Sequence, residues 1–290
     1  MSENTREDAH LHAGVTARSY AGRIMAIHPT AVVDARAEVG RDVEIEAYAI
    51  IRAGVILHDG VHVGPHAVLT GPSSIGAGTR IFPFASIGED PQDLKYRGEP
   101  TRLEVGARNV FREGVTVNRG TGHGGGVTRI GDDNLFMAAS HVAHDCVVGS
   151  YCVFANCAAL AGHVTVGDRV VLGGFSGVHQ HSRIGRCAMV GAAGMAAQDV
   201  PPFTIAQGDR ARLFGLNVVG LRRAGFKLDV MQALKNAYRD LFHQGRPMRI
   251  ALEHVREAYA DVPEVVELVD FCESTQRGVC RSIGAEQPSE

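Results

Sequence analysis

Five of the fourteen histidines in this sequence lie close together, between residues 141 and 181. They are His141, His144, His163, His179 and His181. Imidazole has a reference pKa of about 6.5, so it is the side chain best suited to take up a proton near neutral pH. A single histidine is most often a solvated surface residue, whereas five in so short a stretch favour a functional site.

An aliphatic or aromatic residue recurs at every sixth position over two long stretches, from Ile27 to Ile87 and from Ile130 to Val190. A period of six fits neither a helix, with 3.6 residues per turn, nor a strand, with two. It is typical of the hexapeptide repeat of a parallel β-helix, in which three short strands form one triangular coil. The sequence therefore predicts a mainly β solenoid fold.

This register brings several of the histidines together. His163 and His181 each lie three residues after an interior position, so we expect them to stack in adjacent coils. His144 lies two residues after the interior Val142, one coil earlier and near the same edge. Because stacked strands lie about 4.8 Å apart, the cluster is expected to span about 10–15 Å.

Two uses of such a cluster, and one non-catalytic alternative, remain open from the residues alone. Histidines that meet between solenoid subunits can bind zinc, as in carbonic anhydrases with this fold. Alternatively, one histidine can deprotonate a hydroxyl that attacks an acyl group, and the absence of a GxSxG signature favours direct transfer over a covalent acyl-enzyme. A non-catalytic scaffold would instead show flat repetitive faces, whereas this chain interrupts its repeat twice beside the histidines.

Composition excludes other classes of protein. With 29 basic and 32 acidic residues the net charge is -3, which argues against a nucleic-acid-binding protein. The six cysteines show no CxxC or paired spacing, so reduced core thiols are expected rather than disulfides or a zinc site. No apolar run approaches the roughly 20 residues that cross a bilayer, and no signal peptide is apparent. These features predict a cytoplasmic protein without a transmembrane segment.

The pattern divides the chain into four parts. Beyond Pro201-Pro202 the six-residue period ends, and three apolar stripes at helical spacing follow between Val230 and Cys272. We expect an N-terminal extension (residues 1–25), a β-helix (26–206) with inserted loops (88–104 and 118–129), a helical domain (207–281) and a tail (282–290). Loops that leave a solenoid commonly carry function, since coil stacking does not require them.

Five segments resemble one family, the bacterial UDP-N-acetylglucosamine O-acyltransferases. They are QDLKYRGEPT (92–101), SHVAHDC (140–146), LAGHVTVGD (160–168), GVHQHSRIG (177–185) and QDVPPFTIAQG (198–208). The resemblance implies a left-handed β-helix that forms a homotrimer with active sites between subunits. It also implies transfer of a 3-hydroxyacyl chain from acyl carrier protein to the 3-OH of UDP-N-acetylglucosamine, the first step of lipid A biosynthesis, without a metal or an organic cofactor.

The same resemblance assigns roles to individual residues. His144 matches the general base, Asp145 the residue that supports it, and the Gly162 amide the oxyanion donor. Adjacent strand residues point to opposite faces, so His144 and Asp145 are expected to meet only if they lie at a corner. Positions that match substrate contacts are Asp93, Lys95, His141, His163, His179, Gln180, Asn217 and Arg223. Ala192 matches the position that sets acyl-chain length, where glycine would leave the deepest groove.

Three positions depart from the family pattern. Ala224 replaces a basic residue after Arg223, Asn118 replaces a histidine sometimes present in the glycine-rich loop, and His181 replaces an aromatic residue. A basic run follows the solenoid and suits either a solvated face or a docking site for the acidic carrier protein. It comprises Arg210, Arg212, Arg222, Arg223 and Lys227.

An alternative within the transferases is an acyl-CoA-dependent enzyme, or one that acylates the 3-amino group of a UDP-amino sugar. The relative that N-acylates the next intermediate has a sizeable domain before its repeat, whereas only about 25 residues precede the repeat here. Sequence alone does not distinguish a hydroxyl from an amino acceptor, because the same histidine serves both.

Overall fold

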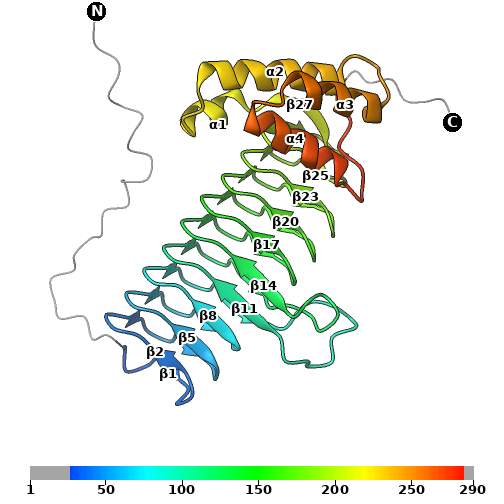
Figure 1. Ribbon diagram of the computed structural model, residues 1–290. Helices are drawn as coiled ribbons and strands as arrows, with labels where there is room; N and C mark the ends of the chain where they lie inside the picture. Colours follow the sequence, from blue (N-terminus) through cyan, green and yellow to red (C-terminus); the bar gives the residue numbers. More distant parts are fainter. Residues whose placement is uncertain (1–26, 284–290) are drawn as a thin grey trace, which may run out of the picture.

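The computed structural model describes residues 27–283, and the expected N-terminal extension lies outside this range. The described residues form a three-sided prism of stacked coils with four helices at its C-terminal end (Figure 1). Ser282 and Ile283, which the sequence placed in the tail, are instead attached to the prism: Ser282 bridges Leu213, and the Ile283 N–H donates to the Leu213 carbonyl.

Three parallel sheets form the sides of the prism. The first sheet comprises β1 (Val32–Val33), β4 (Ile50–Ile51), β7 (Val68–Leu69), β10 (Ser86–Glu89), β13 (Thr116–Asn118), β16 (His141–Val142), β19 (Ala159–Leu160), β22 (Gly177–Val178) and β25 (Met195–Ala196). The second comprises β2 (Glu38–Val39), β5 (Val55–Leu57), β8 (Ser73–Ile75), β11 (Arg102–Val105), β14 (Val127–Ile130), β17 (Val147–Val148), β20 (Thr165–Val166) and β23 (Arg183–Ile184).

The third sheet comprises β3 (Glu44–Ile45), β6 (His62–Val63), β9 (Arg80–Ile81), β12 (Val110–Phe111), β15 (Leu135–Phe136), β18 (Val153–Phe154), β21 (Val171–Leu172), β24 (Met189–Val190), β26 (Thr204–Gln207) and β27 (Arg212–Leu216). Only β27 runs antiparallel to its neighbour. Within each sheet, strands pair with those of the next coil, so residues eighteen apart lie side by side in the coils without an inserted loop, as in β16, β19 and β22. In the last coil the spacing shortens to sixteen residues, as between Met189 and Ile205.

The residues at the six-residue period form the core of the prism. Ile51, Leu69 and Ile87 are completely buried, and burial of such a side chain contributes about 1.5–3 kcal/mol. Ile27 and Val39, which belong to the same series, remain 39% and 38% exposed because they lie in the first coils of the described chain. The repeat therefore identifies the core correctly except at its open end.

Each corner of the prism contains a residue with a left-handed backbone conformation. At the corner between the first and second sheets these residues include Asp145 (φ 58°), His163 (φ 62°) and His181 (φ 63°). Equivalent residues such as Phe175 and Arg169 occupy the other two corners. Because every coil needs such turns, the left-handed conformation of the three site residues belongs to the fold and is not by itself a sign of function.

Both inserted loops leave the prism at the corner between the first and second sheets. One joins β10 to β11 and the other joins β13 to β14, and they lie on the side of the prism that Figure 1 shows at lower right. The flanking strands extend further than expected, so the segments outside strands are residues 90–101 and 119–126. The insertions therefore project from the same edge that carries the histidines.

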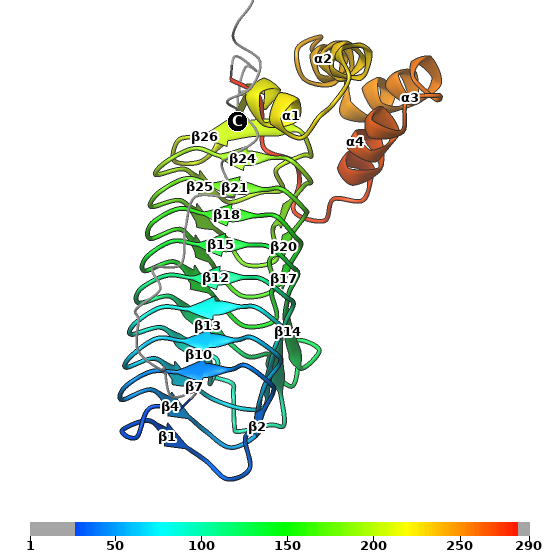
Figure 2. The ribbon, with the colours of Figure 1, turned by 90° about the vertical axis from the view of Figure 1, so that its left-hand side faces the viewer.

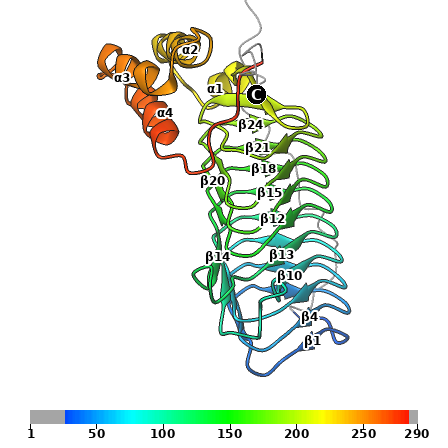
Figure 3. The same cartoon turned by 90° about the vertical axis from the view of Figure 1, so that its right-hand side faces the viewer.

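Four helices follow the prism: α1 (Val218–Arg223), α2 (Leu228–Phe242), α3 (Met248–Ala258) and α4 (Pro263–Glu273). The last three bury the apolar stripes seen in the sequence, whereas the short α1 was not expected. The helices α3 and α4 overhang the side that carries the second sheet (Figures 2 and 3). No helix within residues 27–283 is long and apolar enough to cross a membrane. The structure confirms the predicted class, a left-handed parallel β-helix followed by a small helical region.

Candidate active site

His144 and Asp145 meet at a corner of the prism, as their predicted pairing requires. Strand β16 ends at Val142, and the left-handed turn at Asp145 brings its carboxylate back toward the preceding ring. The His144 Nδ1–H donates to Asp145 Oδ2 over 2.8 Å. This bond fixes the tautomer of His144 and leaves the lone pair of Nε2 available to accept a proton.

The buried carboxylate of Asp145 is held by the second inserted loop. Thr121 donates its backbone N–H to Asp145 Oδ1 over 2.9 Å and its hydroxyl to Oδ2 over 2.6 Å. Gly124 lies against the same carboxylate, where a Cβ would come within 2.2 Å of Oδ2. The loop can therefore close over Asp145 only with glycine at position 124.

These hydrogen bonds determine the ionisation of Asp145. Burial opposes the charged form, but the bonds from His144 and Thr121 outweigh it, so the pKa of Asp145 lies below its ordinary value. The carboxylate is therefore ionised at neutral pH and can stabilise positive charge on His144. Its side chain is completely buried, while that of His144 is 13% exposed and can reach a substrate.

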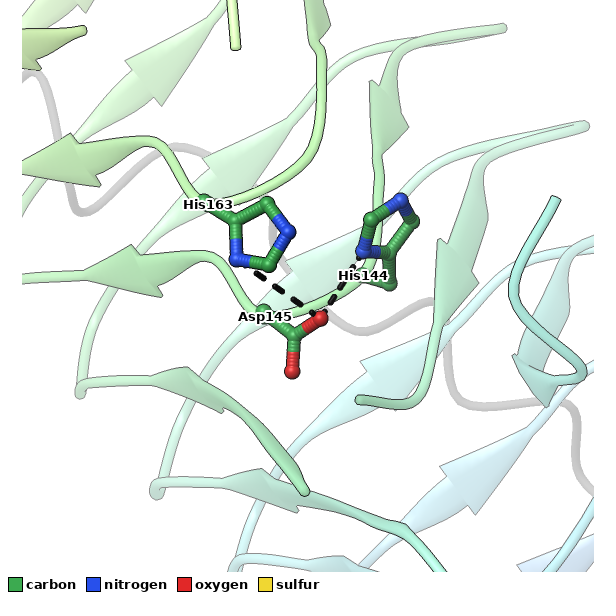
Figure 4. A group of neighbouring side chains, drawn as sticks. All are labelled: His144, Asp145 and His163. Carbon is green, nitrogen blue, oxygen red and sulfur yellow. Dashed lines mark hydrogen bonds and ion pairs between the residues drawn. The ribbon is translucent and has the colours of Figure 1, made fainter. Parts of the chain in front are cut away.

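Asp145, His163 and His181 occupy the same position in three successive coils. His163 Nδ1 lies 3.8 Å from Asp145 Oδ2, and both rings, His144 and His163, are directed at this one oxygen (Figure 4). The His181 ring stacks on His163 with centroids 4.4 Å apart, as the register predicts. Burial lowers the pKa of His163, and the neighbouring histidines lower it further against the opposing effect of Asp145.

The first inserted loop is tied to the second across the site. His123 Nε2 lies 3.2 Å from Asp93 Oδ2, and Asp93 Oδ1 accepts the backbone N–H of Lys95 over 2.9 Å. Asn118 donates from Nδ2 to the Asp90 carbonyl over 2.9 Å. The replacement residue Asn118, at the end of β13, thus ties the first loop to the strand that leads into the second.

A cavity of about 760 Å³ opens between the loops and the histidine corner. Its lining comprises Gln92, Asp93, Leu94, Lys95, His123, Gly124, His144, His163, Gln180 and His181. Five of the predicted site residues, Asp93, Lys95, His144, His163 and Gln180, are thus brought together around one space. A second hollow of about 610 Å³ lies against α4 and contains none of the predicted site residues.

Gly162 lies directly beside the His144 ring. A Cβ at this position would come within 2.4 Å of His144 Cε1, so only glycine leaves room for the imidazole. The neighbouring amides of Ala161 and His163 donate to backbone carbonyls, whereas the Gly162 N–H has no acceptor among the described residues. A free amide next to the base can donate to an oxyanion.

The other predicted residues lie outside this cavity. The ring of His141 bonds to the Thr116 hydroxyl through Nδ1 over 2.7 Å, and its pKa is lowered by burial and by His144. His179 is exposed and contacts the Gln180 carbonyl. Ala192 is exposed at the corner between the third and first sheets, away from the histidine corner.

Two predicted substrate contacts lie in and before α1. Asn217 caps this helix by accepting the Gly220 N–H and also donates to the Cys187 carbonyl over 2.9 Å. Its amide is therefore engaged within the chain. Arg223 is exposed in the last turn of α1 and forms no ion pair with another described residue.

Thr121 and His123 were not anticipated. Both lie in the glycine-rich insertion, whose composition predicted a loop but not which of its side chains would turn inward. The eighteen-residue spacing of Asp145, His163 and His181 did carry a usable signal, because it places the carboxylate directly below the two stacked rings.

Comparison with known families gives two matches. The family "Udp N-acetylglucosamine O-acyltransferase; Domain 2" matches residues 199–280, which include the helices. The family "Bacterial transferase hexapeptide (six repeats)" matches residues 27–71 and 128–162, within the prism.

Solved structures resemble the chain over nearly its whole described length. LpxA from Acinetobacter baumannii is 41% identical, with a TM-score of 0.86 over 89% of this chain and all of that one. LpxA from Bacteroides fragilis, a UDP-N-acetylglucosamine acyltransferase, is 36% identical with a TM-score of 0.85 over 88% of this chain and 100% of that one. The UDP-N-acetylglucosamine acyltransferase from Campylobacter jejuni is also 36% identical, with a TM-score of 0.85 over 89% of this chain and 100% of that one. The chain therefore belongs to the UDP-N-acetylglucosamine acyltransferase family.

Proposed function

We propose that this chain transfers a 3-hydroxyacyl group from acyl carrier protein to the 3-OH of UDP-N-acetylglucosamine, the first step of lipid A biosynthesis. The observation that carries the proposal is the His144–Asp145 pair, which faces a cavity lined by loop residues and lies beside the free Gly162 amide. Family membership supplies the substrate class.

The geometry supports direct attack in one chemical step. His144 Nε2 removes the proton from the sugar hydroxyl while Asp145 stabilises the imidazolium that forms. The sugar oxygen attacks the thioester carbonyl, and the Gly162 N–H donates to the oxyanion of the tetrahedral intermediate. Collapse breaks the carbon–sulfur bond, and the thiolate of the carrier takes the proton back from His144.

A covalent intermediate on cysteine is not part of this proposal. Cys146, the thiol nearest in sequence to the base, is fully buried, and burial raises its pKa to about 12. A thiol in such a site is almost entirely protonated at neutral pH and is inert as a nucleophile. The acyl group is therefore transferred straight to the sugar.

The loops provide groups suited to a sugar nucleotide. Lys95 is exposed on the cavity wall and forms no ion pair with any residue in 27–283, so its ammonium is available for a phosphate. Asp93 is oriented by the Lys95 amide and by His123, and its carboxylate can accept hydrogen bonds from sugar hydroxyls. Gln180, His141, His163 and His179 are proposed to contact substrate from the coils behind them.

The complete site is proposed to form between subunits of a homotrimer. Ala192 and His144 lie at different corners of one prism, and we propose that an acyl chain that starts at His144 extends to the Ala192 position of a neighbouring chain. Apolar side chains flank the Ala192 corner, and Phe175 and Met195 are 67% and 41% exposed in the single chain. Asn217 and Arg223 are proposed to reach the nucleotide in the same intersubunit arrangement.

The basic run after the solenoid is proposed to dock acyl carrier protein. Arg210, Arg222, Arg223 and Lys227 are exposed, and neither they nor Arg212 form ion pairs with other described residues. Uncompensated cations on a chain of net charge -3 attract an acidic partner locally without general affinity for polyanions. We also propose that the enzyme acts in the cytoplasm.

A product assay tests this function. The purified protein is incubated with UDP-N-acetylglucosamine and a series of 3-hydroxyacyl carrier proteins, beside the matching acyl-CoAs, and products are identified by mass spectrometry. We expect an O-acylated sugar nucleotide from the carrier-protein donors. Product only from a UDP-3-amino sugar, or only from acyl-CoA, would replace the proposed acceptor or donor, and no product from any pair would refute the activity.

A further inference from the structure

The side chains of His144, Asp145 and His163 also form a potential set of metal ligands. One ligand atom each from His144, Asp145 and His163 lies within 4.8 Å of the others, and no other group of three such side chains occurs among residues 27–283. Two imidazoles and a carboxylate form a ligand set that zinc commonly takes, with bond lengths of about 2.0–2.2 Å. Ligand atoms around such an ion lie roughly 3–4 Å apart.

The distances between the three ligand atoms are close to that requirement. Asp145 Oδ2 lies 2.8 Å from His144 Nδ1 and 3.8 Å from His163 Nδ1 (Figure 4). An ion therefore needs only small rotations of the three side chains to bind all of them. The two rings are 13% and 19% exposed, so the open coordination position faces the cavity.

The surroundings hold this set in place as the outer shell of a metal site does. Thr121 donates two hydrogen bonds to Asp145, and His181 stacks on the ring of His163. The Thr121 N–H restricts Asp145 through Oδ1, whereas the Thr121 hydroxyl contacts Oδ2, the oxygen that faces both histidines. His181 contacts only the face of the His163 ring and leaves its Nδ1 free for the ion. The fold thus presents two oriented imidazoles on one edge of the cavity, with a buried carboxylate within reach of both.

We propose that His144, Asp145 and His163 bind a divalent zinc ion, and that the bound ion inhibits acyl transfer. The ion takes the place of the proton on His144 Nδ1, and this proton moves through solvent to Nε2, so the ring remains neutral. Nε2, the atom that must be free to accept the proton of the sugar hydroxyl, is then already protonated. The ion acts as an inhibitor and not as a cofactor, because it removes the base from the reaction.

Direct binding measurements test the site independently of catalysis. The full-length protein is freed of metal with a chelator and titrated with Zn²⁺ in competition with a chromophoric zinc indicator. We expect one zinc ion per chain, and an affinity about tenfold or more weaker in both His163→Gln and Asp145→Asn. His181→Phe keeps an aromatic ring on His163 but removes a donor, so its affinity should match that of the unsubstituted chain.

Cobalt and activity provide the second readout. Co²⁺ added to the metal-free protein should give the visible absorption of a four- or five-coordinate ion, and this absorption should be absent in His163→Gln that retains its circular dichroism spectrum. If the proposed reaction is correct, Zn²⁺ at concentrations that fill the site should abolish transfer, with recovery on adding EDTA. Zinc affinities that are equal in the unsubstituted chain, His163→Gln and Asp145→Asn would overturn the site. Filled sites with undiminished transfer would overturn the inhibition, and absence of transfer in metal-free protein would refute only the proposed reaction.

Discussion

The carboxylate of Asp145 links two segments of the chain at the level of single residues. It accepts hydrogen bonds from Thr121 in the inserted loop and from the adjacent His144, and its own backbone N–H donates to Thr128 Oγ1 over 2.8 Å. A buried carboxylate with several donors keeps one orientation, and the orientation of His144 follows from it. The loop therefore takes part in positioning the base.

Thr121→Val should impair the chemical step. The substitution keeps the shape of the side chain and removes one hydrogen bond to a charged group, a contact of about 1.5–3 kcal/mol, so kcat should fall about tenfold or more. The Asp145 carboxylate would then hold the His144 ring less firmly in one orientation. Steady-state kinetics, with kcat and KM determined separately, check this.

Thr121→Ser is the matched control, since it keeps the hydroxyl and should retain most of the activity. A fall in kcat of equal size in Thr121→Val and Thr121→Ser would contradict a role for the hydroxyl. A rise in KM at unchanged kcat would show instead that the loop only helps to bind substrate.

Ala192→Gly should lengthen the preferred acyl chain. Ala192 is exposed at a corner of the prism, and removal of its methyl group deepens the groove proposed there. Space for one more methylene is worth about 1 kcal/mol, enough to shift the ratio of kcat/KM between neighbouring chain lengths severalfold. Competition between carrier proteins that bear different acyl chains measures this ratio, and an unchanged preference would remove Ala192 from the groove.

Register made part of the site predictable from sequence. The repeat placed His163 and His181 in adjacent coils, and the structure stacks their rings. It could also have placed Asp145 below them, because that residue occupies the same position one coil earlier. The inward turn of Thr121 was not predictable, since an inserted loop follows no repeat and its contacts depend on the coils around it.

At the level of elements, the site depends on where the prism tolerates insertions. Both loops leave one corner and are joined by contacts such as Asn118 to the Asp90 carbonyl and His123 to Asp93. The sequence located both loops, but β11 and β14 each begin before the predicted end of an insertion and pair along four residues. The six-residue period could not identify the core residues within β11 and β14, because the inserted loops interrupt it just before each strand.

Two histidines, His141 in β16 and His163 at the corner after β19, make the stability of the protein depend on pH. Burial lowers the pKa values of His141 and His163 below their ordinary value of about 6.5, so the folded chain resists protonation at both sites. The unfolded chain takes up these protons as the pH falls below about 6.5, and stability declines until the pH reaches the lower folded-state values. His144 lowers the pKa of His141 further. The pKa of His163 is raised by Asp145 and lowered by three neighbouring histidines, His181, His144 and His123.

His141→Gln should therefore lose less thermal stability than the unsubstituted chain when the pH is lowered from 7.5 to 5.5. The variant cannot take up the proton at position 141 in either state, so that contribution to the pH dependence disappears. Melting temperatures by calorimetry at the two pH values measure the difference. His58→Gln, at an exposed position, should behave like the unsubstituted chain, and an equal pH response in all three proteins would contradict the interpretation.

The helices show what periodicity can and cannot predict. The stripes of α2, α3 and α4 repeat over three or more turns, and each is buried as expected. The helix α1 has six residues and one buried side chain, Leu221, so it contains too little pattern to be recognised. Its position depends on Asn217, which caps the helix and also donates to the carbonyl of Cys187, a residue thirty positions earlier in the chain.

At the level of the whole molecule, a buried carboxylate joins the prism to the segment after α4. Asp199 accepts bonds from the Arg183 N–H and Nε over 2.8 and 2.9 Å and from the Thr275 hydroxyl over 2.8 Å. A second pair, Arg186 with Glu267, connects the last coils to α4. These contacts fix the helices at the end of the prism, close to the residues proposed to bind nucleotide.

Asp199→Ala should destabilise the protein markedly. It leaves Arg183, whose side chain is only 29% exposed, without its partner, and removal of one member of a largely buried pair costs about 3 kcal/mol. Thermal or denaturant unfolding measures the loss. Asp34→Ala breaks an exposed pair with Arg36 at the other end of the prism and should leave the transition unchanged, so similar losses in the two variants would contradict the docking role of Asp199.

Sequence could predict the solenoid because one local rule repeats in every coil. The docking of the helices is not repetitive and depends on single pairs such as Asp199 and Arg183, which no local pattern reveals. The proposed arrangement of three chains follows from family resemblance and from the separation of Ala192 and His144 on one prism.

The most direct test of the account compares the intact enzyme with His144→Gln in the same product assay. Glutamine occupies a similar volume but cannot accept the proton of the sugar hydroxyl, so the rate of O-acyl product formation should fall at least about 100-fold. Circular dichroism and sedimentation should be unchanged, which would show that the fold and assembly persist. A variant that retains its fold and works within about tenfold of the intact enzyme would contradict His144 as the base and with it the proposed mechanism.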